Sequence, residues 1–116
     1  MSVGIEIYYK LLNAGKDVLL YGYSGANINK EYNKKDLLLY DGLIEIDVYA
    51  LENKGAAEAF RDNNIRILKE CIYEYHHPRL TDGDETVGYF AIRTASKIFR
   101  EFKENAQPPI SGGVVF

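Results

Sequence analysis

The chain has 116 residues, a length typical of one domain, and 47% of them are hydrophobic while 27% are charged. Disordered chains combine low hydrophobicity with high charge, so this balance argues against a disordered chain. The net charge is -3, with 6 Lys and Arg against 9 Asp and Glu in residues 1–58 and 8 of each in residues 59–116. Because phosphate backbones are bound by clustered Lys and Arg, this composition argues against nucleic acid as a partner.

The N-terminus lacks the basic region and apolar run of a secretory signal, and no stretch approaches the roughly 18 apolar residues of a membrane span. We therefore expect a cytoplasmic protein without membrane contact. Cys71 is the only cysteine, so we expect a buried structural thiol, placed by its spacing in a helix.

The first part of the chain predicts a hairpin. Residues 3–9 alternate apolar with other side chains, which indicates a half-buried strand with Glu6 and Tyr8 on its outer face. Residues 13–16 resemble a turn, and residues 17–23 read as a second strand that is apolar on both faces. Residues 24–36 have no periodicity and are rich in Gly, Asn and Lys, so they predict a long loop.

Asp41-Gly42 favours the positive φ angles of a two-residue hairpin turn, and apolar residues 37–40 and 43–46 flank it. The resulting register places Tyr40 opposite Leu43. It also places Glu45 on the same face and, if pairing continues, opposes Asp36 to Asp47.

The second half predicts two helices and a final strand. Helical spacing runs from 56 to 75, interrupted by Asn64, and more clearly from 90 to 106, before two prolines. Residues 110–116 are short and apolar enough for an edge strand. The expected fold class is therefore α+β, with a mostly antiparallel sheet of about four to five strands and two helices packed on one face.

Two segments suggest chemistry. His76 and His77 lie near Asp82 and Asp84, which invites a metal site, but adjacent histidines on a helix point roughly 100° apart. A helix C-terminus followed by a turn is the favoured interpretation. Residues 22–26 come within one residue of the G-x-S-x-G nucleophile motif, although a loop follows Ser24 where the motif needs a helix, which favours a glycine-bearing turn.

Tyrosine is the remaining unusual feature, with ten Tyr against five Phe and no Trp. Tyrosines beside carboxylates on an exposed sheet face suit a basic protein partner, because tyrosine offers large contact area and carboxylates pair with Lys and Arg. The alternative is that these rings merely cover the sheet with their hydroxyls in water. The candidate interface residues are Glu6, Tyr8, Tyr32, Asp36, Tyr40, Glu45, Asp47 and Tyr49.

No family resemblance carries residues over, but the size, acidity and single cysteine look like those of small bacterial accessory and toxin-immunity proteins. The leading hypothesis is a non-enzymatic domain without a cofactor that binds a basic protein. A second is a small metal- or ligand-binding enzyme with its site around His76, His77, Asp82 and Asp84. A third is a homodimer in which residues 114–116 add to a neighbouring sheet.

Overall fold

The computed structural model describes residues 4–27, 32–82 and 85–115. Within them lie a five-stranded antiparallel sheet of order β4-β3-β2-β1-β7 and a two-stranded ribbon of β5 and β6. The elements are β1 (Ile5–Ala14), β2 (Val18–Asn27), the 3-10 helix η1 (Lys34–Leu38), β3 (Gly42–Asp47), α1 (Val48–Asn53), α2 (Ala56–Arg61), β4 (Ile65–Lys69), β5 (His76–Asp82), β6 (Glu85–Gly88), α3 (Tyr89–Asn105) and β7 (Ser111–Val115). The predicted α+β class is confirmed.

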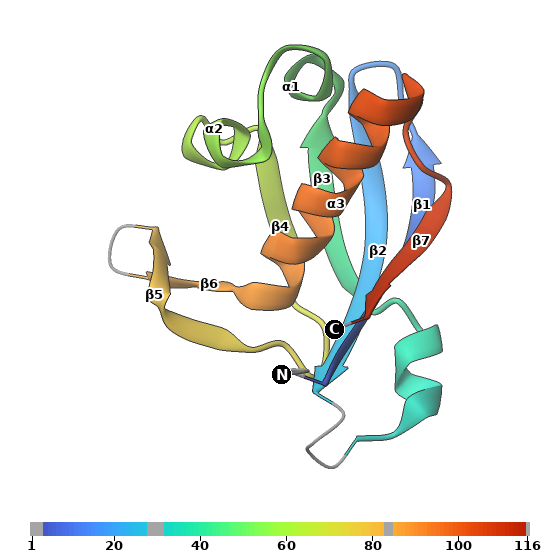
Figure 1. Ribbon diagram of the computed structural model, residues 1–116, viewed down its shortest axis with the longest axis vertical. Coiled ribbons are helices and arrows are strands. Elements are labelled where there is room, and N and C mark those ends of the chain that lie inside the picture. The colour runs from blue at the N-terminus through green and yellow to red at the C-terminus, as the bar shows by residue number, and fades with distance from the viewer. Residues whose placement is uncertain (1–3, 28–31, 83–84, 116) are drawn as a thin grey trace.

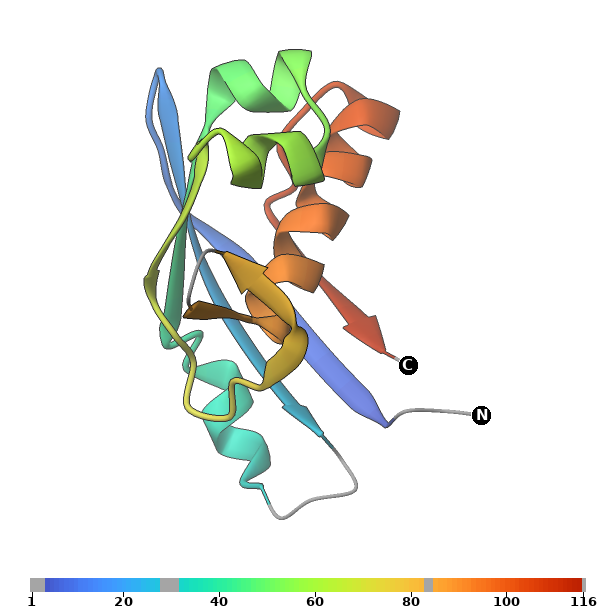
Figure 2. The same ribbon diagram turned by 90° about the vertical axis from the view of Figure 1, so that its left-hand side faces the viewer.

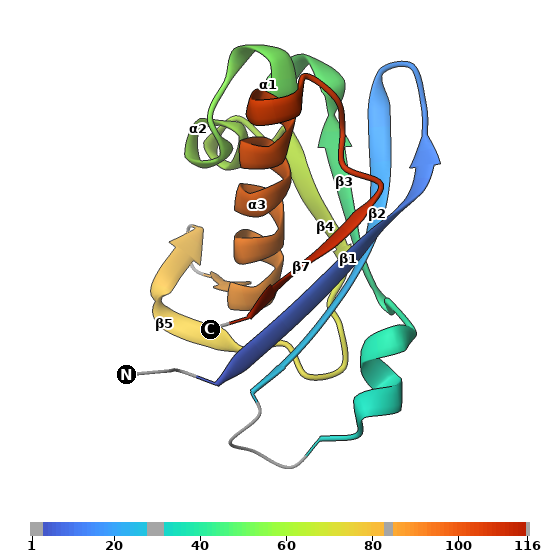
Figure 3. The same cartoon turned by 45° about the vertical axis from the view of Figure 1, so that its right-hand side comes forward.

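The molecule is layered, with α1, α2 and α3 on one side of the large sheet (Figure 1; Figure 2). The 3-10 helix η1 lies on the opposite side, near the end of the sheet where β2 finishes (Figure 3). We call this side the outer face. No helix in the described ranges is long and apolar enough to cross a membrane.

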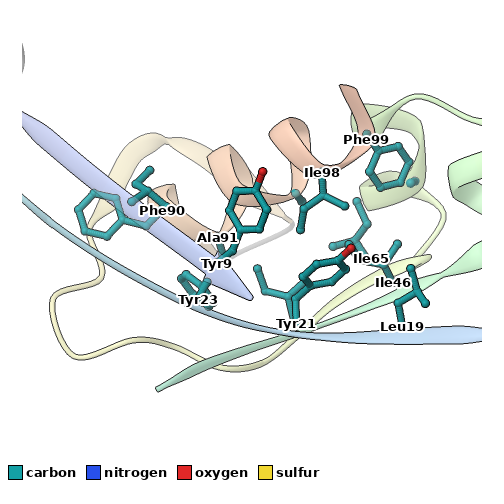
Figure 4. Close-up of a cluster of buried hydrophobic side chains, with 14 of the residues drawn as sticks. Tyr9, Leu19, Tyr21, Tyr23, Ile46, Ile65, Phe90, Ala91, Ile98 and Phe99 are labelled. Atoms are coloured by element: carbon teal, nitrogen blue, oxygen red, sulfur yellow. The ribbon is translucent and has the colours of Figure 1, made fainter. Parts of the chain in front are cut away.

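Helix α3 provides most of the helical side of the core. Its buried residues recur at spacings of three and four, as predicted, and pack over inward-facing tyrosines of β1 and β2 (Figure 4). The helix ends where Ala106 adopts a left-handed conformation, with φ of 57°, and donates its N–H to the Phe102 carbonyl at 2.7 Å. The buried residues of α3 are Phe90, Ala91, Thr94, Ala95, Ile98 and Phe99.

The predicted first hairpin is confirmed, and both strands are longer than expected. Tyr9 faces Tyr23 across the ladder, and a bulge lies between Leu11 and Asn13. The turn is closed by Gly15 N–H bonding the Val18 carbonyl at 3.0 Å. The predicted loop from 24 to 36 is wrong at both ends, because β2 continues to Asn27 and η1 begins at 34; residues 28–31 lie outside the described ranges.

The predicted hairpin around Asp41-Gly42 is wrong. Gly42 begins β3, which pairs with β2 on one side and β4 on the other, so neither edge of β3 is left for residues 37–40. Residues 34–38 form η1 instead, with Leu37 only 1% exposed and Leu38 69% exposed. Tyr40, at φ 47°, redirects the chain into β3.

The predicted helix from 56 to 75 is also wrong beyond its first turns. Helix α2 ends at Arg61, and Asn63 adopts a left-handed φ of 60° before β4. Ile65 then packs inward while β4 pairs with β3. Cys71 follows this strand in a loop, although its predicted burial is confirmed. The short helix α1 had no counterpart among the expected elements.

The predicted C-terminal strand is confirmed as β7, which pairs antiparallel with β1. The chain reaches it after the two prolines that follow α3. The Tyr21 hydroxyl donates to the Pro109 carbonyl at 2.8 Å and so fixes this connection to the core.

Candidate functional site

The outer face is defined by alternation along β1 and β3. In β1, half-buried Glu6 and Tyr8 alternate with buried inward residues, as predicted. In β3, Glu45 and Asp47 alternate in the same way with Ile44 and other buried residues. The strand period therefore puts four of the eight predicted interface residues on the outer face.

A cluster of tyrosines and carboxylates, which we call the tyrosine cluster, joins β1, η1 and the loop after β4. The hydroxyls of Tyr8 and Tyr32 donate to Glu6 at 3.3 and 3.4 Å. The Tyr73 hydroxyl donates to Asp36 Oδ2 at 2.7 Å. The Tyr32 and Tyr73 rings meet edge to face, with centroids 6.3 Å apart, which links the two halves of the cluster.

Tyr40 adjoins this cluster. Partial burial raises the pKa of Tyr8, and the neighbouring Glu6, Tyr32 and Tyr40 raise that pKa further, so the hydroxyl remains a neutral donor. Tyr40 also lies over Gly22, where an added Cβ would fall 2.9 Å from the Tyr40 carbonyl oxygen and 3.2 Å from Leu12 Cδ1. The absence of a side chain at Gly22 thus lets Tyr40 and Leu12 cover β2.

Two hydrogen bonds hold η1 on the outer face, and a third caps it locally. The Asn33 side chain accepts from Lys35 N at 3.0 Å, and Asn33 N donates to the Tyr73 hydroxyl at 2.9 Å. The buried Ser24 hydroxyl donates to the Leu37 carbonyl at 2.5 Å. The cluster residues of η1 are therefore positioned by packing and by bonds to distant segments.

Glu45 and Asp47 form a separate group around Arg66. The Arg66 guanidinium contacts both carboxylates at 2.6 Å, and Asn64 donates to Asp47 at 2.9 Å. Hydrogen bonding to Arg66 holds the pKa of Asp47 below its ordinary value of 3.8. Arg66, which the sequence analysis missed, thus offsets much of the charge predicted to attract a basic partner.

Tyr49 does not share the outer face, contrary to expectation. It lies on α1, on the opposite side of the sheet, and exposes 64% of its surface. Lys54 Nζ lies 5.8 Å from the centroid of its ring. The prediction failed because β3 ends at Asp47 and the chain turns directly into a helix.

The histidine segment is a strand and not a helix end. His76 begins β5, and its side chain contacts Glu70. The side chains of His77 and Asp82 and the whole of Asp84 lie outside the described residues. Across the part of the chain that is described, no three His, Cys, Asp or Glu residues gather closely enough to hold a metal ion, so the metal site stays a prediction.

Ser24 lies within β2, and the interpretation of residues 22–26 as a turn is wrong. At Gly22 and Gly25, the absence of a side chain leaves room for neighbouring groups to pack against β2. An added Cβ on Gly25 would fall 2.7 Å from the Phe90 ring. Ser24 is buried, and its hydroxyl bonds the Leu37 carbonyl, so its role is to link β2 to η1.

Glu74 is a polar anchor that sequence reasoning missed. Its carboxylate accepts from the N–H groups of Phe90 and Ala91, at 2.8 and 3.1 Å, and so caps the N-terminus of α3. It also accepts from the Tyr23 hydroxyl at 2.7 Å, and burial together with this carboxylate raises the pKa of Tyr23. Burial raises the pKa of nearby Cys71 to about 12, which keeps its thiol protonated.

Comparison of the chain with protein-family models, with curated proteins and with solved structures finds no match. The geometry of the outer face is therefore the basis for inferring a function.

Proposed function

We propose that the chain is a non-enzymatic protein-binding domain that engages a basic partner through the tyrosine cluster. The observation that carries this proposal is the state of Glu6 and Asp36. Among the described residues, both carboxylates receive tyrosine hydroxyls, and neither forms an ion pair. Glu45 and Asp47, by contrast, already share Arg66.

A Lys or Arg side chain of a partner would supply the missing positive charge. Hydroxyl donors orient both carboxylates, so the partner cation would meet fixed acceptors. The electron-rich faces of Tyr32 and Tyr73 would add a cation–π attraction. Tyrosines also have few rotatable bonds, so immobilising them in an interface costs less entropy than immobilising lysine or glutamate.

Apolar surface borders the cluster. Leu38 and Leu39 follow Asp36 in the chain and are 69% and 63% exposed. Leu12, which is 48% exposed, contacts the Gly22 position beneath Tyr40. An interface of standard anatomy combines such apolar contacts with oriented polar groups, so this surface can support specific binding.

A finer form of the proposal is that the partner is a basic toxin that this domain neutralises. The net charge of -3 and the cluster carboxylates support electrostatic attraction to such a partner. Co-expression with the neighbouring open reading frame tests this form. Growth rescued by the native chain, and abolished by a Glu6→Gln, Asp36→Asn double variant, is the expected outcome. Equal rescue by both chains would contradict neutralisation through the cluster.

The broader proposal is tested by affinity capture with matched variants. The native chain and Tyr49→Ala, which changes a tyrosine on the helical side, should retain the same basic protein. Tyr32→Ala should weaken that complex by about tenfold or more, because truncation of a central aromatic residue commonly costs about 2 kcal/mol. Thermal unfolding of each variant controls for folding. If Tyr32→Ala is folded and binds every captured protein as tightly as Tyr49→Ala, the proposal is wrong.

A further inference from the structure

Strand β7 forms one edge of the large sheet and has β1 as its one hydrogen-bonded neighbour within the described residues (Figure 3). Its sequence, Ser-Gly-Gly-Val-Val, contains no charge and no proline. An edge strand carries a row of backbone N–H and C=O groups that can pair with another chain. The register of β7 shows which residues supply them.

The backbone of Leu11 donates to the Ile110 carbonyl at 2.7 Å, which continues the ladder in which Lys10 faces Ser111. In antiparallel pairs, residues that bond their neighbour alternate with residues whose backbone groups point away. Residues 110, 112 and 114 therefore point toward β1. Ser111, Gly113 and Val115 direct their N–H and C=O groups outward.

The opposite edge of the sheet is protected in ways that β7 is not. The pairing of β4 with β3 contains a register shift beside Leu43. Arg66 of β4 holds two carboxylates, and charged Lys69 and Glu70 are exposed at the end of the strand. Irregular pairing and charge are the usual protections against edge-to-edge association. The two edges therefore differ in their capacity to accept another strand.

We propose that two copies of the chain associate through β7, which pairs antiparallel with the same strand of a second copy to form one continuous sheet. With Gly113 opposite the same glycine, Ser111 faces Val115 at each end. Every outward residue then exchanges both backbone bonds, for about six hydrogen bonds in total. The arrangement has two-fold symmetry, as most homodimers do.

Charge favours a second copy as the occupant. Glu6 faces Val115 and Lys10 faces Ser111 in the β1–β7 ladder. In the dimer, Glu6 of one copy would lie in the same row as Lys10 of the other, three strand spacings or about 14 Å away. Opposite charges are thus aligned across the junction, and their attraction at this separation is strongest at low salt. Ile110, which precedes β7 and is 74% exposed, adds apolar surface beside it.

Light scattering and amide hydrogen exchange on the full chain test this proposal together. As concentration rises from micromolar to millimolar, the mass should increase from 13.2 kDa toward twice that value. In the monomer, the amides of Gly112 and Val114 should be protected by β1 while those of Ser111, Gly113 and Val115 exchange freely. Dimer formation should extend protection to all five amides.

Ser111→Pro removes an outward N–H but spares the ladder with β1, so it should weaken association by about tenfold or more while the chain stays folded. Ser111→Thr keeps that donor and should dimerise as the native chain does. A native chain that stays monomeric at millimolar concentration would overturn the proposal. So would a dimer whose outward β7 amides remain unprotected, a result that does not depend on the proline variant folding.

Discussion

At the scale of single residues, Glu74 shows how one side chain can join three segments. It bonds the first turn of α3 and the Tyr23 hydroxyl of β2 from a loop that follows β4. Gly88 lies close enough that an added Cβ would be 2.5 Å from this carboxyl group. The carboxylate therefore replaces the local N-cap side chain that α3 lacks.

We predict that Glu74→Gln lowers the free energy of unfolding by about 1 to 3 kcal/mol. The amide keeps one acceptor oxygen, loses the charge that favours the helix N-terminus, and places an N–H₂ donor against backbone donors. Urea denaturation measures the change. Glu52→Gln, at an exposed position on α1, is the control and should change stability far less. Equal effects of the two substitutions would contradict the capping role.

The Arg66 group predicts a pH dependence. Arg66 holds the folded-state pKa of Asp47 below 3.8. The ionised Asp47 carboxylate therefore contributes its full stabilisation above pH 3.8. That contribution is lost as the pH falls through the lower folded-state pKa. The free energy of unfolding should therefore fall more steeply with acid for the native chain than for Asp47→Asn. Parallel pH profiles from urea denaturation would show that this ion pair has no such effect.

At the scale of elements, the packing of α3 on β2 depends on a glycine. Gly25→Ala would bring a Cβ within 2.7 Å of the Phe90 ring, in a core that has little room to relax. We predict a loss of about 1 to 3 kcal/mol, as is typical of overpacking. Gly55→Ser is the matched control, because an added Cβ there meets no atom within 4 Å and serine suits the N-cap position of α2 that Gly55 occupies. Thermal unfolding compares them, and similar melting temperatures would refute the close contact.

Apart from β7, whose short apolar run was enough to predict an edge strand, the elements that sequence patterns predicted correctly are those whose partners are near in the chain or whose pattern is long. The stripe of α3 spans several turns, and the strands around Lys16 form a local hairpin. The Asp41-Gly42 signal failed because β3 found partners in β2 and β4, and tertiary pairing outweighed a local turn preference. The turn-forming run at 62–64 was the signal from which the end of α2 and the start of β4 could have been predicted.

The positions of candidate-site residues could be derived only where they follow strand alternation, whereas Tyr32, Asp36 and Tyr40 were named without the η1 segment that places them. Glu6 and Tyr8 were placed correctly because they belong to one regular strand. Tyr73 and Arg66 were missed because their contacts with Asp36 and Asp47 join residues 37 and 19 positions apart. Nothing in a local pattern reports such distant pairs.

At the scale of the whole molecule, the two proposals use adjoining parts of one sheet. The tyrosine cluster lies on the outer face, whereas dimer formation uses the edge of β7. A two-fold axis perpendicular to the sheet would turn both outer faces in the same direction. A dimer could then present two clusters to a multivalent partner, and linked binding would raise the overall affinity beyond that of one cluster.

We propose that the tyrosine cluster is the binding surface of this domain. Amide hydrogen exchange of the native chain, with and without its captured partner, tests this most directly. Binding through the cluster should slow exchange at residues 6–8 and 32–38 and leave α1 and α2 unchanged. Slower exchange confined to the helical side around Tyr49, with unchanged rates in those two segments, would contradict it.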